Sequence, residues 1–283
     1  MKYLVFGATG NIGGRVARKL IEDGHRPSVF VRDEKKARML FGDQIDIHAG
    51  DLDSPGRSLE TALAEAARIF LVTDGPDLAE QDRVVSTTAI HAGVEHIVKL
   101  STLDAVAGVG TGAWHAAGEA AVAATGVPFT FIRAAGFMSN ALSWSYDIRH
   151  AGMVRSSTGD GRIAFIHPDD IAAVVMTALT MPEEVDRTVV ITGPEALSYG
   201  EMASVIGSTI GKRVGFEAIS DQKAYADAAA WAGDSRYVDA LIDIWRAVRE
   251  GRIDTVTTEV RQIIGREPVR FAQWAAENSA SFR

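Results

Sequence analysis

The chain begins with a short apolar run, Tyr3–Phe6, which is followed at once by the stretch "GATGNIGG", residues 7–14. Three glycines in the spacing Gly-x-x-Gly-x-x-Gly allow a tight turn and a close approach of the backbone to a ligand. The amphipathic segment behind them is typical of a helix whose first amides and dipole face an anion. Strand, glycine turn and helix in this order predict a loop for the pyrophosphate of a dinucleotide. The residues expected to bind it are Gly7, Thr9, Gly10, Asn11, Ile12 and Gly13.

Outward from this loop, short β-branched runs alternate with helical stretches as far as about residue 133. Strands are expected at Tyr3–Phe6, Ser28–Val31, Ile45–His48, Arg68–Thr73, His96–Leu100 and Phe129–Arg133. Helices are expected at Asn11–Asp23, Ser58–Ala67, Leu78–Ala92 and Thr111–Thr125. This alternation predicts an α/β fold with a Rossmann-type doubly wound parallel sheet, which binds ligands at the carboxyl ends of its strands.

The second half of the chain has a looser, mostly helical pattern. A pair of strands is expected at Met153–Arg155 and Arg162–Ile166, and a further strand at Thr188–Thr192. Helices are expected over residues 169–180, 198–211, 221–249 and 271–282. The chain therefore divides into a dinucleotide-binding domain over residues 1–150, with sheet strands returning from about 151–192, and a smaller, mostly helical substrate or lid lobe over 193–283.

Composition limits the classes of function. The 283 residues include no cysteine, which excludes disulfides, thiolate metal sites and a cysteine nucleophile, and fits a reducing cytoplasm. A net charge of −8 argues against nucleic-acid binding driven by overall charge. The N-terminal apolar run is too short for a signal peptide or a membrane span, so we expect a cytoplasmic protein with no membrane partner. The seven histidines have no paired spacing, so no metal site is predicted, and no Gly-x-Ser-x-Gly follows a strand as in serine hydrolases.

The residues after the second expected strand indicate which dinucleotide binds. Arg32 follows Val31 directly, and Lys36 lies one helical turn further on. Because a guanidinium forms paired, charge-assisted bonds with a phosphate, Arg32 and Lys36 are predicted to bind the 2′-phosphate of NADP(H). Asp33 would instead favour the free ribose of NAD(H), unless it serves as a helix N-cap. NADP(H) is the preferred cofactor, with NAD(H) possible.

Two further strand ends are expected to contribute to the dinucleotide site. Asp51 and Leu52, in "GDLDS", follow the third strand and are predicted to lie beside the adenine ring. Thr73 and Asp74 end or follow the fourth strand, where a backbone passes the ribose or the pyrophosphate.

The segments "GATGNIGG", "VRDEKKA", "GDLDS", "HIVKLST", "GVPFTFIRAAGFMSN" and "HPDDIA" together resemble the NmrA-like, atypical branch of the short-chain dehydrogenase/reductase superfamily. The similarity runs from Met1 to about Thr192. The resemblance implies an extended Rossmann fold, a nicotinamide dinucleotide and a small C-terminal substrate lobe. It leaves open three kinds of function: a reductase of quinones or dyes, a tailoring oxygenase or isomerase of aromatic polyketides, and a dinucleotide-sensing regulator without turnover.

The acid–base pair of that superfamily is absent from this chain. Most members use a tyrosine as proton donor, with a lysine four residues later that lowers its pKa. The five tyrosines here are followed, four residues later, by Gly7, His150, Ala203, Ala229 and Leu241. An electrophilic acceptor such as a quinone or a cationic dye can take a hydride without a strong protein acid, so the missing pair does not exclude a reductase.

Three residues are candidates for the catalytic roles. On the helix where the superfamily has its pair, His115 and Glu119 have the same spacing. His115 is the predicted proton donor, and Glu119 is predicted to support its charged form. Ser101 and Thr102 match the position where the superfamily places a hydroxyl near the substrate carbonyl, although both residue types also form turns and caps.

Aromatic and methionine side chains follow the sixth expected strand, and they suit a flat, apolar ligand as well as a protein core. The predicted substrate residues are Trp114, Phe137, Met138, Trp144, Tyr146 and His167. The resemblance implies that the stretch containing His167 and Asp170 supports the nicotinamide. The alternative is that Asp169 or Asp170 only caps the next helix. The combined expectation is an NADP(H)-preferring reductase of a quinone-like or aromatic polycyclic carbonyl compound, for which a homodimer is a possible state.

Overall fold

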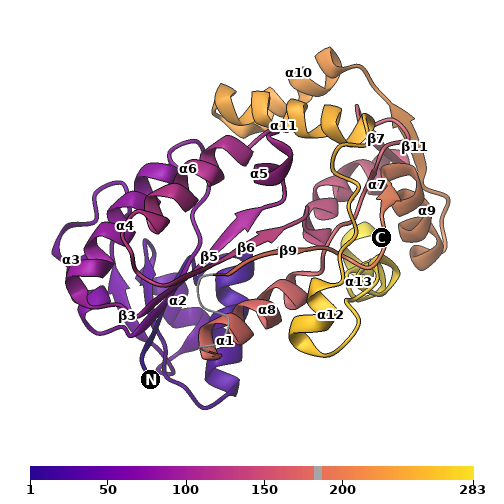
Figure 1. The fold of residues 1–283 in the computed structure, drawn as a ribbon. Helices are drawn as coiled ribbons and strands as arrows, with labels where there is room; N and C mark the ends of the chain where they lie inside the picture. The colour runs from indigo at the N-terminus through magenta and orange to yellow at the C-terminus, as the bar shows by residue number, and fades with distance from the viewer. Residues whose placement is uncertain (182–186) are drawn as a thin grey trace. The chain divides into compact units, whose positions relative to one another are not determined.

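The computed structural model describes residues 1–181 and 187–283. The chain divides into two compact units, and each unit is assembled from three separate segments. Unit 1 comprises Met1–Ser101, Trp114–Arg133 and Pro168–Val189. Unit 2 comprises Thr102–Ala113, Ala134–His167 and Val190–Arg283. Figure 1 labels many of the helices and strands of both units.

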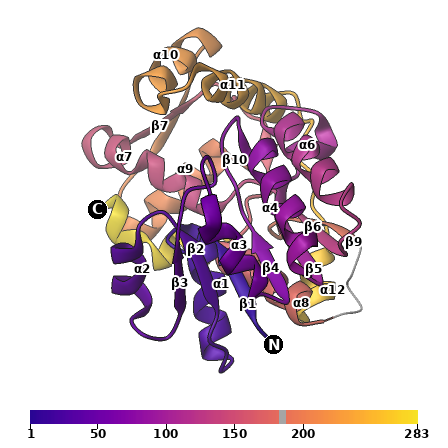
Figure 2. The ribbon, with the colours of Figure 1, turned by 90° about the vertical axis from the view of Figure 1, so that its left-hand side faces the viewer.

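A seven-stranded sheet has the strand order β3-β2-β1-β4-β5-β6-β9. Its strands are β1 (Tyr3–Phe6), β2 (Ser28–Val31), β3 (Asp46–Ala49), β4 (Arg68–Leu71), β5 (His96–Thr102), β6 (Phe129–Ala134) and β9 (Arg187–Ile191). β1 pairs in parallel with β2 on one side and with β4 on the other, so the chain reverses its direction of winding at β1 (Figure 2). This order confirms the predicted doubly wound Rossmann fold.

Helices cover both faces of this sheet. The helices are α1 (Asn11–Glu22), α2 (Glu34–Phe41), α3 (Gly56–Ala64), α4 (Leu78–Ala92), α6 (Gly112–Ala123) and α8 (Pro168–Thr180). Because crossovers between parallel strands are right-handed, the reversal at β1 places α1 and α2 on one face and α3, α4 and α6 on the other. The packing agrees, since α1 lies against α8 and α3 lies against α4. An ion pair of 2.6 Å between Arg15 and Asp169 joins α1 to α8.

The core of unit 1 follows from the apolar runs of the sequence. β1, β2 and β4 are buried along their whole length, as expected of parallel strands covered on both faces. α1 buries Ile12, Val16 and Leu20, which recur every four residues and therefore lie on one side of the helix. These patterns are local, which explains why the strand and helix positions here agree with the sequence to within a few residues.

Unit 2 is mostly helical and has its own core. Its helices are α5 (Asp104–Ala107), η1 (Met138–Trp144), α7 (Ser145–Ala151), α9 (Tyr199–Ile210), α10 (Asp221–Ala232), α11 (Ser235–Arg249), α12 (Glu259–Ile264), α13 (Phe271–Glu277) and η3 (Ser279–Phe282). Its short strands are β7 (Met153–Ser156), β8 (Arg162–Ile163), β10 (Leu197–Ser198) and β11 (Gly215–Ala218). Met202, Ile206, Phe271 and Trp274 are among the side chains buried at its centre.

The expected pairing of the strands near residues 153 and 162 is wrong. β7 pairs in parallel with β11, and β8 pairs antiparallel with β10. The connecting residues pack on α11 instead of forming a hairpin: a side chain at Gly161 would overlap the Val248 carbonyl, and the Arg249 side chain donates a hydrogen bond to the Ser157 carbonyl. Among the described strands after residue 151, β9 alone joins the seven-stranded sheet.

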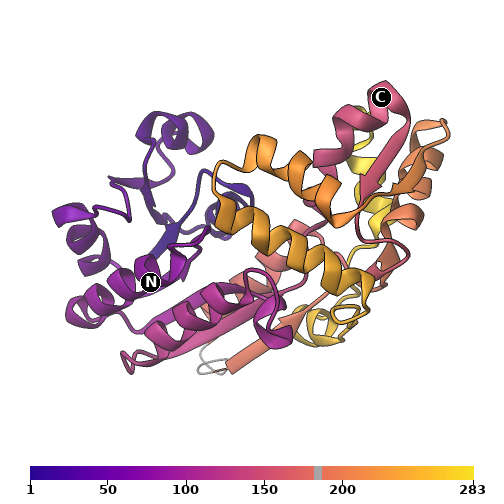
Figure 3. The same cartoon turned by 90° about the horizontal axis from the view of Figure 1, so that it is seen from above.

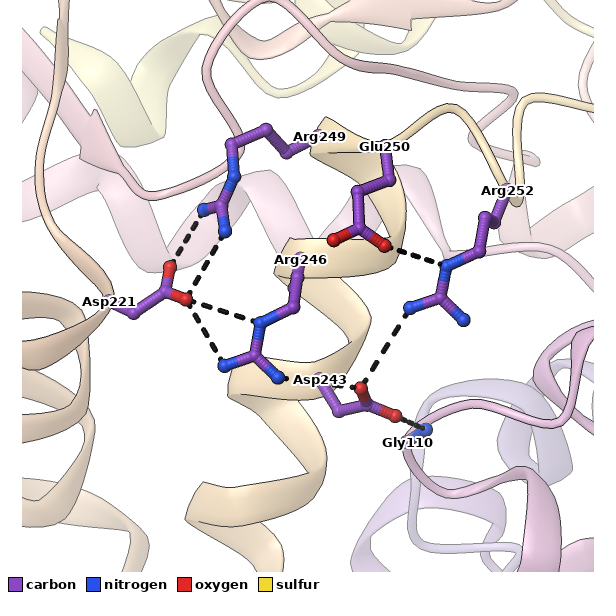
Figure 4. A network of polar contacts seen from close by, with 7 residues as sticks. All are labelled: Gly110, Asp221, Asp243, Arg246, Arg249, Glu250 and Arg252. Carbon is purple, nitrogen blue, oxygen red and sulfur yellow. Dashed lines mark hydrogen bonds and ion pairs between the residues drawn. The ribbon is translucent and has the colours of Figure 1, made fainter.

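The alanine-rich stretch from Asp221 to Arg249 forms two helices that pack side by side (Figure 3). The chain turns at Gly233, whose φ of +73° favours glycine, and Asp234 then caps α11. Asp221, at the start of α10, accepts hydrogen bonds from Arg246 and Arg249 of α11 (Figure 4). These ion pairs connect the first turn of one helix to the last turns of the other.

Asp243 of α11 also holds the loop after α5, because its carboxylate accepts a 2.7 Å hydrogen bond from the Gly110 amide (Figure 4). Asp104, the first residue of α5, accepts a hydrogen bond from Thr111 of that loop. Burial raises the pKa of Asp104 from 3.8 to about 6, opposed by hydrogen bonds from Thr111 and Thr102, and the Asp243 carboxylate raises it further.

Substituting Asp104 by asparagine is expected to stabilise the protein at pH 8 by about 1–3 kcal/mol. The folded protein binds the Asp104 proton more tightly than the unfolded chain does. The free energy of unfolding therefore falls as pH rises from 3.8 to about 6, and above pH 6 the whole loss is present. Urea unfolding of the wild type and of Asp104→Asn at pH 4 and pH 8 measures the difference in stability. The gain in the free energy of unfolding should nearly vanish at pH 4. An equal gain at both pH values would contradict it.

Candidate active site

The glycine loop has the geometry that a pyrophosphate site needs. Gly7 has a φ of +64°, which favours glycine, and its carbonyl accepts a 2.9 Å hydrogen bond from the Gly10 amide. A Cβ at Gly13 would overlap the Gly7 carbonyl and lie 2.7 Å from the Phe6 carbonyl, so α1 can approach β1 this closely only with glycine. Gly10 is the N-cap of α1, with no side-chain cap and no acidic residue in the first turn. The first amides of α1 are therefore available to an anion.

The other loop residues contribute in different ways. Thr9 is half-buried and Asn11 is exposed, so both side chains reach the surface of the loop. Asn11 also accepts a hydrogen bond from Arg15 one turn later. Ile12 is 4% exposed and belongs to the buried face of α1, so only its backbone can contact a ligand.

The charged residues after β2 divide into two groups. Asp33 is the N-cap of α2, and its carboxylate accepts a 2.9 Å hydrogen bond from the Lys36 amide. The capping role therefore accounts for Asp33, while the Lys36 side chain remains exposed. Arg32 is exposed and makes no hydrogen bond or ion pair with any residue that the structure describes. Its guanidinium is thus free to bind a phosphate.

The predicted residues after β3 and β4 also differ from one another. Asp51 is exposed and accepts a hydrogen bond from the Asp53 amide, and Leu52 is half-buried against the core. Asp74 is exposed, but Thr73 is buried, and its hydroxyl donates a 2.8 Å hydrogen bond to Asp82 of α4. The Thr73 side chain is therefore engaged inside the protein, so only its backbone is left for a ligand.

All predicted cofactor residues lie in unit 1. They stand in the loops or first helical turns that follow β3, β2, β1 and β4, and these four strands are neighbours in the sheet in this order. The carboxyl ends of parallel strands meet at one edge of a sheet, so residues up to 67 positions apart, Gly7 to Asp74, lie along the same edge. The change of winding direction between β1 and β4 is the position where doubly wound folds bind dinucleotides.

The two hydroxyls predicted near a substrate carbonyl have other partners. Ser101 is 3% exposed and donates a 2.6 Å hydrogen bond to Glu119 of α6, so its proton is not directed at a ligand. Thr102 accepts a 3.2 Å hydrogen bond from the Asp104 amide and forms the turn before α5. Both hydroxyls therefore satisfy polar groups of the fold, and their catalytic roles stay predictions.

Glu119 does not support a charged His115. Its carboxylate accepts the Ser101 hydrogen bond and forms a two-point ion pair with Arg133 of β6. His115 is half-buried, and its Nδ1 atom is buried without a hydrogen-bond partner among the described residues. Burial, together with the charge of Lys99, lowers the pKa of His115 from 6.5 to about 3. The imidazole is therefore neutral at physiological pH, and the predicted imidazolium is wrong.

A buried pair of charges that the sequence did not predict lies against Gly118 of α6. Lys99 of β5 and Asp82 of α4 are both fully buried, with Nζ 2.6 Å from Oδ2. A signal for this pair exists in "HIVKLST", where a lysine interrupts a strand that is otherwise suited to burial on both faces. The partner could not be found that way, because Asp82 lies on a helix among several charged residues.

The structure gives the predicted substrate residues different environments. Met138 is fully buried in the core of unit 2, which corrects its assignment to a pocket. Trp144 is half-buried and packs on Tyr199, with ring centroids 4.8 Å apart. Tyr146 is 65% exposed and stacks on His150 of the same helix. These three side chains therefore do not gather into one aromatic pocket within unit 2.

The remaining substrate candidates fall in both units. Phe137 and His167 belong to unit 2, whereas Trp114 belongs to unit 1. Phe137 is half-buried and forms a parallel bridge with Ile166. His167 is buried, and its Nε2 lies 3.1 Å from the Glu277 carboxylate of α13, a partner 110 residues later. Asp169 and Asp170 lie in the first turn of α8, which begins at Pro168, and not at its N-cap.

No three His, Cys, Asp or Glu side chains of residues 1–181 and 187–283 are grouped so that they could hold a metal ion. No helix of this part of the chain combines the length and the apolar character needed to cross a membrane.

Comparison with solved structures identifies the same fold in nucleotide-dependent reductases. An NADPH-dependent quinone oxidoreductase from Escherichia coli, complexed with NADPH, superposes with a TM-score of 0.88 at 23% identity, over 98% of this chain and 99% of that one. The triphenylmethane reductase of a Citrobacter species, complexed with NADP(H), gives a TM-score of 0.87 at 21% identity, over 99% of this chain and 100% of that one.

Sequence comparison finds relatives along the whole chain. An NAD(P)H azoreductase from Xenophilus azovorans is 32% identical over 99% of this chain and 98% of its own length. A (4-alkanoyl-5-oxo-2,5-dihydrofuran-3-yl)methyl phosphate reductase from Streptomyces griseus is 33% identical over the same shares. The NmrA-like family matches residues 1–252. Because this match includes all of unit 1 and the relatives extend over 99% of the sequence, the chain belongs to the NmrA-like family.

Proposed function

We propose that this protein is an NAD(P)H-dependent oxidoreductase that transfers a hydride to a conjugated, electron-poor acceptor, a quinone-like or aromatic polycyclic carbonyl compound. The observation that carries the proposal is the loop at residues 7–13, where three glycines and an uncapped α1 leave backbone amides for a pyrophosphate. The full-length relatives, both named as reductases, support the reaction class. The aromatic substrate class rests on the sequence, and the azo compounds and furanones of these relatives are further acceptors to test.

The residues present fit a nicotinamide dinucleotide. The amides at the start of α1 would hold the pyrophosphate, and the exposed Arg32, with Lys36 nearby, would bind the 2′-phosphate. The bound nicotinamide supplies the hydride, so the protein itself must orient the acceptor and exclude water. His115, as a neutral imidazole, would donate a hydrogen bond to the acceptor and would not transfer a proton as a strong acid.

Replacing Arg32 by alanine is expected to weaken NADPH binding by about 1.5–3 kcal/mol, the scale of a charge-assisted hydrogen bond, and to leave NADH binding nearly unchanged. Fluorescence titration of both nucleotides with the wild type and the variant measures this. Arg38→Ala is the matched control, because Arg38 is also exposed on α2 but pairs with Glu34. Equal losses for NADPH and NADH would show that Arg32 does not select the phosphorylated nucleotide.

The proposed activity is tested by following NADPH and NADH oxidation with quinones, triarylmethane dyes, azo dyes, furanones and polycyclic aromatic ketones. Turnover that depends on one of these acceptors supports the reductase. Tight nucleotide binding without turnover on any acceptor would contradict it and would favour a dinucleotide-sensing regulator. Conversion of a polycyclic substrate without net consumption of nucleotide would instead identify an isomerase.

A further inference from the structure

The segment between β4 and α4 is held to the rest of unit 1 through a side chain and not through its backbone. In the part of the chain that the structure describes, the backbone amides and carbonyls of Thr73 and Asp74 form no hydrogen bond. The Thr73 hydroxyl instead donates a 2.8 Å hydrogen bond to Asp82, in the second turn of α4. The position of Thr73 and Asp74 therefore depends on where the Asp82 carboxylate lies.

Asp82 is fixed by two neighbouring elements. Its Oδ2 atom lies 2.6 Å from Nζ of Lys99 on β5, and both side chains are 0% exposed. On α6, a Cβ at Gly118 would overlap the same oxygen, so the carboxylate fills the space that a side chain there would take. An apolar pair of similar volume often stabilises a fold as well as a buried ion pair does, so this pair is a candidate for a role beyond stability.

The segment that Asp82 holds lies beside the glycine loop. A Cβ at Gly7 would lie 2.7 Å from the side chain of Val72, which directly precedes Thr73. β1 and β4 pair in parallel, and their carboxyl ends form the edge at which a doubly wound sheet binds a dinucleotide. Asp74 is exposed. Backbone groups without partners at this edge suit the hydroxyls of a ribose or the oxygens of a pyrophosphate.

We propose that Asp82, held in place by Lys99, is a positioning residue for the dinucleotide. Through the Thr73 hydroxyl it fixes the backbone of Thr73 and Asp74 where the ribose and pyrophosphate bind, so this segment need not be ordered when the nucleotide arrives. The inference rests on the proposed function, because it requires a nucleotide at this edge. Since NADPH and NADH share the ribose and the pyrophosphate, both should depend equally on Asp82, unlike the dependence expected for Arg32.

Thr73→Val tests the inference, because it removes the hydroxyl and keeps a branched side chain of similar shape. Fluorescence titration is expected to show the Kd of NADPH and that of NADH raised by about 3- to 10-fold, the scale of one hydrogen bond. Thr73→Ser restores the hydroxyl and should recover most of the wild-type affinity. Unchanged affinity in Thr73→Val, or equally weak binding in Thr73→Ser, would overturn the inference.

Thr130→Val is the matched control. Thr130 is 2% exposed, and its hydroxyl lies 3.1 Å from Nε2 of His96 in the same unit. It is the second residue of β6, near the amino end of that strand. Urea unfolding is expected to show similar losses of stability for the two valine variants, while only Thr73→Val loses nucleotide affinity. Equal losses of affinity in both variants would mean that general destabilisation is the cause and would overturn the inference.

The double variant Asp82→Leu/Lys99→Met isolates the role of the buried pair, because it removes the acceptor of Thr73 and leaves no charge unpaired. It should weaken both nucleotides by the same factor as Thr73→Val, and adding Thr73→Val to it should cause no further loss. Additive losses would mean that Thr73 and Asp82 act separately, which would overturn the inference. If Thr73→Val does not fold, wild-type affinity in the double variant is by itself sufficient to overturn it.

The same proteins separate this inference from the proposed function. If the variants bind nucleotide as expected but no acceptor is reduced, the role of Asp82 stands and the reductase proposal fails. If an acceptor is reduced while Thr73→Val binds both nucleotides as tightly as the wild type, the reductase stands and the role of Asp82 is refuted. A wild type that binds neither NADPH nor NADH would refute both.

Discussion

Replacing Asp82 by alanine is expected to lower the free energy of unfolding by about 3–5 kcal/mol, because it leaves the Lys99 ammonium buried without its partner. The carboxylate is fully buried, contacts Nζ at 2.6 Å and accepts the Thr73 hydroxyl, so one substitution removes two polar interactions. It also empties the space beside Gly118 that the carboxylate fills. Urea unfolding at pH 7 measures the loss.

The matched control for this effect is the double variant Asp82→Leu/Lys99→Met. With neither charge present, the desolvation cost of both groups disappears, and the stability is expected to lie within about 1–2 kcal/mol of the wild type. A double variant as unstable as Asp82→Ala would mean that packing around α4 and β5, and not the unpaired charge, determines the loss.

Replacing Gly13 by alanine is expected to abolish measurable nucleotide binding and to destabilise the fold by about 2–4 kcal/mol. The new Cβ would overlap the Gly7 carbonyl and lie 2.7 Å from the Phe6 carbonyl. Both are backbone atoms, so the clash is relieved only by moving α1 away from β1, which displaces the amides that face the pyrophosphate. Titration with NADPH and urea unfolding measure the two effects.

Gly200→Ala is the control for that substitution. Gly200 is also helical, but a Cβ there would meet Phe216 at an ordinary 3.5 Å, so the expected result is unchanged nucleotide binding and a gain of up to about 1 kcal/mol from helix propensity. If Gly13→Ala bound NADPH as tightly as Gly200→Ala does, the close contact of α1 with β1 would not be what forms the site.

Several features of the fold and the site could be predicted because they depend on neighbouring residues alone. Tyr3–Phe6, the glycine turn and α1 follow one another within 22 residues, and their order is enough to predict strand, loop and helix. The exposure of Arg32 also follows from its place at a strand end, while its binding of a 2′-phosphate stays a prediction. The capping role of Asp33 was one of the two alternatives that its position allows.

The sequence did not predict interactions between groups that lie far apart along the chain. Ser101 was expected to face a ligand, but its hydroxyl donates to Glu119 on another element. Met138 has the chemistry of a pocket residue, yet it lies in the core of unit 2. β7 was expected to pair with the next strand and pairs with β11, about 60 residues later. A hydroxyl, a methionine or a short strand is compatible with more than one environment in a folded protein. The residue types alone therefore do not determine which environment each of them has.

The sequence by itself determined that this chain winds as a Rossmann fold with a dinucleotide loop at its start, since the periods of apolar residues and the glycine spacing are properties of contiguous segments. The tertiary structure alone decided the ionisation of His115 and the burial of Lys99 with Asp82. Charge states depend on which groups are removed from water together, and that is set only when β5, α4 and α6 pack against one another.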